Sequence, residues 1–138
     1  MAIDWGRRRV GIALSDEGRS IASPHMVVQR SGSLERDLGR IVEILRSNNV
    51  SLVVFGLPIR LDGSMGPEVE GVLEIVGKLG EKTGVPIITW DERLSTTAAE
   101  RALIGGNVSR KKRRGLVDQV AAALILQSFL DSDPGGAP

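Results

Sequence analysis

A continuous apolar run rich in β-branched residues constrains the fold of this chain more than any other feature. It spans residues 51–57 and ends at Pro58, which is the pattern of a strand covered on both faces in a parallel sheet. An amphipathic helical pattern capped by Ser33 precedes the run, and a second one that starts at Pro67 follows it. Because parallel strands are joined by crossover helices, these segments predict an α/β fold.

The other segments place three strands before this unit, and a strand and two helices after it. The first three strands are close in sequence, so we expect them to pair in antiparallel fashion. A capping-box pattern opens a short helix at Thr97, a basic loop follows, and the last helix covers residues 116–130. The expected strands are 2–5, 10–15, 26–29, 51–57 and 86–90. The predicted fold class is α/β, a mixed five-stranded sheet with helices on both faces.

Length and composition limit the organisation of the chain. With 138 residues, we expect one domain over residues 1–130 and a disordered C-terminal tail over residues 131–138. The absence of cysteine excludes a disulfide scaffold, a thiolate zinc site and a cysteine nucleophile. No apolar stretch approaches the roughly 20 residues that span a bilayer, and no signal-peptide pattern is present. The expected location is the cytoplasm.

Basic residues are concentrated in two short segments, although the chain carries 18 Lys and Arg against 17 Asp and Glu. Local basic patches on a nearly neutral chain are typical of proteins that contact nucleic-acid phosphates. A solvated loop is the alternative interpretation of such a run. The candidate nucleic-acid-binding residues in the two segments are Arg7, Arg8, Arg9, Arg110, Lys111, Lys112, Arg113 and Arg114.

Acidic residues stand at strand ends and at a helix start. Asp4 lies inside the apolar first strand, Asp91 and Glu92 directly follow the last strand, and Asp118 begins the last helix. Such carboxylates suit Mg²⁺ or Mn²⁺, whose preferred ligands are oxygens. Each acid also has a structural alternative, since Asp118 would favour a helix N-terminus and the adjacent pair would solvate a strand end. Neighbours on an extended segment point to opposite sides, so only one of Asp91 and Glu92 is expected to face Asp4.

Four motifs resemble the YqgF/RuvX family in the order in which that family carries them. They cover nearly the whole chain and read AIDWGRRRVGIALSD, FGLPIRLDGSMGP, WDERLSTTAAE and VDQVAAALILQSFL. The resemblance implies a ribonuclease H-like fold of the resolvase branch. It also implies a nuclease that matures the 5′ end of pre-16S ribosomal RNA, with Holliday-junction resolution as the family's older assignment.

Site residues follow from the resemblance, position by position. Asp4, Glu92 and Asp118 match the family's three catalytic acids, which implies that they bind the metal ions of a metal-dependent endonuclease. Asp16 and Asp62 match further motif positions, for which a loop role or an outer contact is expected. Arg93 is a candidate to neutralise phosphate charge, with a structural ion pair as the alternative.

Several alternatives stay open at the sequence level. Structured RNA and branched DNA are both met through phosphates, so the sequence does not choose between them. A phosphotransferase of the actin-like ATPase type is disfavoured, because such enzymes close two domains around a nucleotide. A binding module that uses its acids only for folding is the non-enzymatic alternative. No membrane partner is expected, and the chain is predicted to be a monomer or a homodimer.

Overall fold

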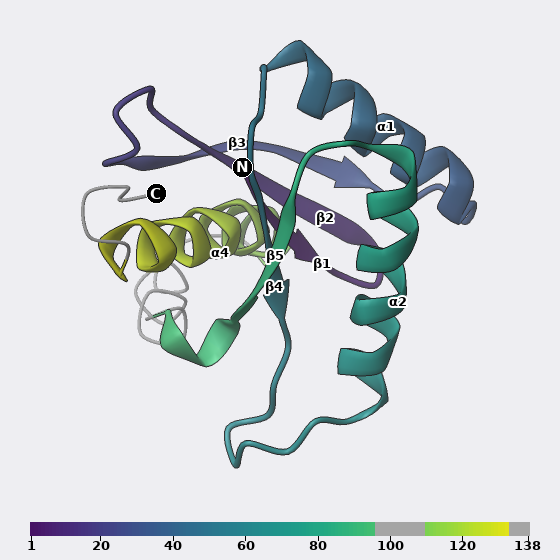
Figure 1. Cartoon of the computed structure of the whole chain (residues 1–138). Helices are drawn as coiled ribbons and strands as arrows, with labels where there is room; N and C mark the ends of the chain where they lie inside the picture. Colours follow the sequence, from purple (N-terminus) through teal and green to yellow (C-terminus); the bar gives the residue numbers. More distant parts are fainter. Residues whose placement is uncertain (96–109, 133–138) are drawn as a thin grey trace.

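Five strands form one mixed sheet in the order β3-β2-β1-β4-β5 (Figure 1). The computed structural model describes residues 1–95 and 110–132, with side chains described in 1–95 and 120–132. Strands β1, β4 and β5 run parallel to one another, while β2 is antiparallel to both β1 and β3. The strands are β1 (Ala2–Trp5), β2 (Arg9–Ser15), β3 (Ala22–Gln29), β4 (Val53–Leu57) and β5 (Ile87–Asp91). The predicted mixed α/β sheet is confirmed.

Helices cover both faces of this sheet (Figure 1). The helical elements are α1 (Leu34–Ser47), α2 (Pro67–Lys82), the short 3₁₀ helix η1 (Glu92–Leu94) and α4 (Arg110–Ser132). The Ser33 side chain accepts a hydrogen bond from the Arg36 N–H and so caps α1, and Pro67 stands in the first turn of α2. Both helix starts agree with the sequence analysis. Among the described helices, none is long and apolar enough to cross a membrane.

Side-chain alternation in the strands divides the core into two layers. On one face, Ile3 and Phe55 pack with apolar side chains of α1 and α2. On the other face, Ala2 and Val54 pack with Ile125 and neighbouring residues of α4. Because successive residues of a strand point to opposite faces, the residue after Ile3 in β1 returns to the α4 side.

The third strand begins earlier than predicted, at Ala22 instead of residue 26. It includes Pro24, which pairs with Ala13 beside a register shift between Ile12 and Ala13. Proline is tolerated there because β3 is an edge strand and the pairing is already irregular.

The predicted basic loop is wrong over residues 110–114, which form the first turns of α4. The helix therefore begins six residues before the predicted start at residue 116. Lys and Arg are good helix formers, and a single glycine inside a helix, here Gly115, costs only about 1 kcal/mol relative to alanine. At its other end α4 continues to Ser132, two residues beyond the expected boundary. The short helix expected at Thr97 lies outside the described residues.

Candidate active site

Asp4 lies in the middle of the sheet, on the face that α4 covers. It pairs with Gly11 of β2 in the antiparallel register. On its other side Ile3 pairs with Phe55, so continuing that parallel register by one residue sets Asp4 beside Gly56 of β4. Asp4 is half-buried and shares its face with Ala2, which packs against α4. A carboxylate is thereby held at the carboxyl end of a central strand, where sites of α/β sheets form.

Glu92 extends its carboxylate over Gly56. A Cβ atom added at Gly56 would lie 2.8 Å from Oε1 of Glu92 and 2.9 Å from Cδ1 of Ile125 in α4. The carboxylate therefore occupies the space that a side chain at position 56 would fill, on the α4 face of the sheet. Since Gly56 neighbours Asp4 in the sheet, Asp4 and Glu92 lie on the same face at the same edge.

Asp91 has a different environment from its neighbour. Its carboxylate accepts hydrogen bonds from the backbone N–H, Nε and Nη2 of Arg93 at 2.7–3.1 Å. The hydrogen bond from the Arg93 side chain holds the pKa of Asp91 below its ordinary value, and the same bond raises the pKa of Arg93. Trp90 packs against Phe129 of α4, so by alternation Asp91 turns towards the other face. Asp91 thus caps η1 and forms an ion pair, the structural alternative considered for Arg93.

The third predicted acid lies in α4. The backbone of α4 passes through position 118, but the Asp118 side chain is outside the described residues. Within the described part of the chain, no group of three acidic or histidine side chains suited to a metal is present. The structure thus brings together Asp4 and Glu92 of the predicted acids and leaves the position of the Asp118 carboxylate undescribed.

The basic residues of the first segment lie at the same edge of the sheet as the acids. Arg7 and Arg8 are exposed in the turn between β1 and β2, directly after Asp4 and Trp5, and Arg9 at the start of β2 is half-buried. The turn is tight because the Gly6 N–H donates to the Arg9 carbonyl at 2.9 Å, and a Cβ at Gly6 would lie 2.6 Å from that oxygen.

The basic residues of the second segment belong to the start of α4, and their side chains are outside the described residues. They are Arg110, Lys111, Lys112, Arg113 and Arg114.

The two other acids matched to family motifs have loop roles in the structure. Asp16 follows β2, at the end of the sheet opposite to Asp4. Its carboxylate accepts hydrogen bonds from the backbone N–H groups of Ser20 and Ile21, which lower its pKa. Asp62 lies in the loop after β4 and accepts from the hydroxyl and the N–H of Ser64, which lower its pKa. Neither carboxylate is directed at Asp4 by these contacts.

Comparison with known proteins agrees with this architecture. The family described as "RuvX: Holliday junction resolvase" matches residues 1–132. The chain belongs to the RuvX family. RuvX membership makes it a nuclease of the hydrolase class, as the four motifs imply.

Relatives and solved structures support this assignment. The chain is 46% identical to a protein of Desulforudis audaxviator over 99% of this chain and 96% of that one, and 42% identical to a protein of Desulforamulus reducens over 96% of each. Both carry the name "Putative pre-16S rRNA nuclease". RuvC of T. thermophilus, solved with a Holliday junction substrate, superimposes with a TM-score of 0.59 at 18% identity over 94% of each chain. This RuvX chain therefore has the RuvC-like, ribonuclease H-like fold.

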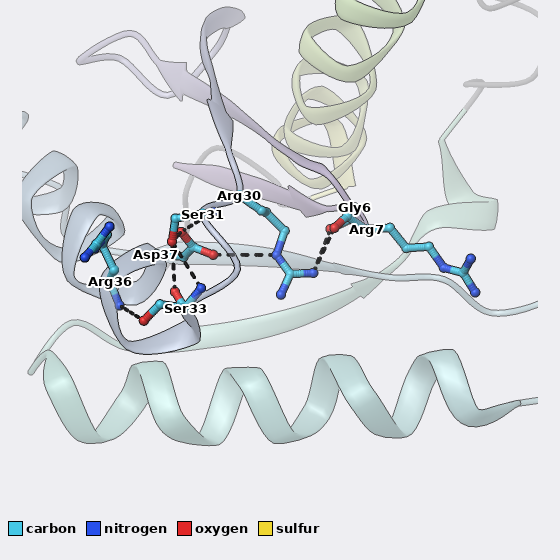
Figure 2. Close-up of polar contacts among 7 residues, drawn as sticks. All are labelled: Gly6, Arg7, Arg30, Ser31, Ser33, Arg36 and Asp37. Carbon is cyan, nitrogen blue, oxygen red and sulfur yellow. Dashed lines mark hydrogen bonds and ion pairs between the residues drawn. The ribbon is translucent and has the colours of Figure 1, made fainter.

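The sequence analysis missed one feature of the site. Arg30 and the buried Asp37 connect to the turn that carries Arg7 and Arg8 (Figure 2). The available signal was an acidic residue one turn before Ile41, a core residue of α1, which is an unusual place for an unpaired carboxylate.

Proposed function

We propose that this chain is a divalent-metal-dependent endonuclease that cleaves structured RNA, with Asp4, Glu92 and Asp118 as its catalytic acids. The observation that carries the proposal is the Glu92 carboxylate, which lies over Gly56 on the face and at the edge of the sheet where Asp4 lies. Asp4 belongs to β1 and Glu92 begins η1 directly after β5, so the two acids come from different elements and lie at one end of the sheet on the α4 face. Carboxylates placed in this way offer oxygen ligands for a divalent cation, which nuclease chemistry uses.

The donor set fits Mg²⁺ or Mn²⁺. The acids offer only carboxylate oxygens, which these hard cations accept, and the chain contains no cysteine. Gly56 leaves space for Glu92, since any larger residue would overlap its carboxylate. Asp4, Glu92 and Asp118 would hold the ions.

Position 118 in α4 is consistent with this role. Ala122 and Ile125 of α4 pack against the sheet beside Val54 of β4. Residues four and seven positions apart share a helix face, so position 118 belongs to the stripe that these two residues occupy. We therefore propose Asp118 as the third acid.

Each group has a distinct task in hydrolysis. Two divalent ions, when bound, supply an activated water and charge stabilisation at the leaving oxygen. Arg7 and Arg8 bind the phosphates of the strand next to the scissile bond, because they are exposed in the turn that follows Asp4. Asp91 is paired with Arg93, and Glu92, whose carboxylate lies over Gly56, is the member of the adjacent acidic pair proposed to act with Asp4.

Pre-16S ribosomal RNA is the proposed substrate, cleaved at its 5′ end in the cytoplasm. The names of the relatives from Desulforudis audaxviator and Desulforamulus reducens support this choice, at 46% and 42% identity over nearly the whole chain. A Holliday junction is the second candidate, supported by the description of the family and by the fold shared with RuvC. Junction resolution requires two symmetric active sites, whereas RNA processing is compatible with a monomer.

A cleavage assay with both substrates tests the proposal. Purified protein is incubated with Mg²⁺ or Mn²⁺ and either a 5′-extended 16S precursor fragment or a four-way DNA junction, alongside Asp4→Asn and Asp118→Asn. We expect internal cleavage of the RNA that both variants lose. Paired symmetric nicks in the junction, with intact RNA, would favour the resolvase. Tight binding without cleavage of either substrate would leave a non-catalytic binding module.

A further inference from the structure

A buried charge in α1 is connected to the basic turn beside Asp4. Asp37 is only 3% exposed. Its Oδ1 accepts hydrogen bonds from the Ser31 N–H at 3.0 Å and the Ser31 hydroxyl at 2.8 Å, and its Oδ2 lies 3.7 Å from Nε of Arg30 (Figure 2). A buried carboxylate needs a nearby positive charge, and Arg30 supplies it to Asp37 as an ion pair without a direct hydrogen bond.

Arg30 contacts each residue of the turn between β1 and β2. Its Nη1 lies 3.1 Å from the carbonyl oxygen of Arg7 and 3.4 Å from that of Gly6, and donates to both (Figure 2). Its backbone N–H donates to the Arg8 carbonyl at 2.8 Å. One side chain and its own backbone therefore hold the whole turn.

Aromatic contacts tie the same guanidinium to the catalytic strand. The central carbon of the Arg30 guanidinium lies 5.0 Å from the ring centroid of Trp5, within the range of a cation–π contact. Trp5 follows Asp4 in β1, and its ring stacks on Phe55 of β4 at 6.2 Å. The turn is thus fixed relative to the strand that carries Asp4.

These contacts hold in place the backbone of the turn that carries the two exposed arginines. Figure 2 shows the Arg7 side chain extending away from the Arg30 guanidinium, and both Arg7 and Arg8 are exposed. A turn held in place in the free protein loses less conformational entropy when it binds a ligand, so its charged side chains bind phosphate more strongly.

We infer that Arg30 is a positioning residue, which sets Arg7 and Arg8 to receive the phosphates of the strand bound at Asp4. Asp37 acts one step further back, by securing Arg30. The inference rests on the proposed function in one respect, namely that Arg7 and Arg8 contact phosphate.

The first test measures the dissociation constant of a labelled RNA stem-loop without divalent ions, so that no cleavage occurs. Arg30→Lys keeps the charge opposite Asp37 but lacks the planar fork that reaches two carbonyls. We expect binding to weaken by about tenfold. Arg36→Lys is the matched control, because Arg36 is exposed and its side chain points away from the turn (Figure 2). An effect of Arg30→Lys no larger than that of the control would overturn the inference.

A double-mutant cycle separates positioning from a general structural effect. Substituting both Arg7 and Arg8 with alanine should weaken binding and reduce the slope of log K against log salt by about 1 to 2. In that background Arg30→Lys should have no further effect, because the arginines it positions are gone. An additive effect, or unchanged binding when both arginines are removed, would contradict the inference. If Arg30→Lys does not fold, Asp37→Asn takes the place of Arg30→Lys in the cycle. The asparagine keeps the Oδ1 acceptor and removes the negative charge that pairs with Arg30.

The same experiment distinguishes this inference from the nuclease proposal. Non-additive binding energies support the positioning role even if the protein with Mn²⁺ cleaves nothing, in which case only the nuclease proposal fails. Cleavage that depends on Asp4, together with additive binding energies, would leave the nuclease and remove the positioning role.

Discussion

Asp91 and Glu92 show how one step along the chain changes the role of a carboxylate. Asp91 ends β5 on the face away from α4 and pairs with Arg93, two residues on, whereas Glu92 begins η1 and places its carboxylate above Gly56. The change from strand to 3₁₀ helix occurs between them. Two adjacent acids are therefore not interchangeable, and Glu92 is the one whose carboxylate lies on the face of the sheet that carries Asp4.

Acidification should reveal the structural role of Asp91. Its folded-state pKa lies below the ordinary value of 3.8 because of the Arg93 hydrogen bond, so the pair stabilises the fold above that pH and loses its effect as pH falls through the folded-state pKa. Asp91→Asn should therefore lower the melting temperature slightly at pH 7, with a difference from wild type that shrinks below pH 3.8. Thermal melts across this range measure it.

Measuring the wild type and Asp91→Asn at the same pH values controls for the titration of other carboxylates. Asp16, Asp62 and Glu68 also have lowered pKa values, but they titrate in both proteins and cancel in the difference. A deficit that stays constant well below pH 3.8 would assign Asp91 a role other than the ion pair.

At the residue scale, strand alternation supplied the candidate acids, and the choice of Glu92 over Asp91 came only from the family resemblance. Alternation along a strand says that only one of Asp91 and Glu92 faces Asp4, yet which one depends on where β5 stops, and strand ends are set by tertiary contacts. The link from Asp37 through Arg30 to the turn could not be predicted either, because it joins an α1 residue to a turn about 30 positions earlier.

At the scale of elements, the contact between β4, η1 and α4 builds the site. Gly56 has no side chain, so Glu92 of η1 and Ile125 of α4 both approach the backbone of β4. The absence of a side chain at position 56 thus brings an acid from one element against a helix from another.

Gly56→Ala should damage activity more than stability. The added Cβ would meet the Glu92 carboxylate at 2.8 Å and Ile125 at 2.9 Å, so we expect a cost of about 1–3 kcal/mol in the free energy of unfolding. Displacement of Glu92 should reduce kcat by roughly tenfold to a hundredfold. Denaturant unfolding and steady-state cleavage measure the two effects.

Gly71→Ala is the matched control for this substitution. A Cβ at Gly71 in α2 meets no atom within 4 Å, so the variant should gain up to about 1 kcal/mol of helix stability and keep its activity. Full activity in Gly56→Ala would show that the position of Glu92 does not matter for cleavage.

The elements themselves were largely predictable from the sequence. The run over residues 51–57 and the caps at Ser33 and Pro67 predicted the crossover unit, and the structure confirms it. Two of the boundaries that differ from the prediction have clear physical reasons. Pro24 enters β3 because that strand is at the sheet edge, and residues 110–114 are helical because a basic run is compatible with a helix as well as with a loop.

At the scale of the whole molecule, the candidate site lies between the sheet and α4. Asp4 lies in β1, and the basic turn follows that strand. The Glu92 carboxylate of η1 lies on the face of the sheet that α4 covers, and the proposed third acid belongs to α4. A cation bound there would cross-link strand, 3₁₀ helix and long helix.

Metal binding should therefore stabilise the folded protein as a whole. A ligand at 100 times its Kd adds about 2.7 kcal/mol, which raises the melting temperature of a domain of this size by several degrees. We expect this rise with Mn²⁺ in the wild type and its loss in Asp4→Asn, measured by thermal melts with and without EDTA. An equal rise in both proteins would locate the bound metal elsewhere.

Single-turnover cleavage of the precursor RNA by Glu92→Gln and Asp91→Asn measures which of the two adjacent carboxylates acts in hydrolysis. Both substitutions remove one negative charge from adjacent positions, so they differ only in which carboxylate is lost. We expect Glu92→Gln to lower the cleavage rate by at least about a hundredfold, and Asp91→Asn to stay within about threefold of wild type. The reverse order, or equal losses, would contradict the assignment of Glu92 as the acid that acts with Asp4.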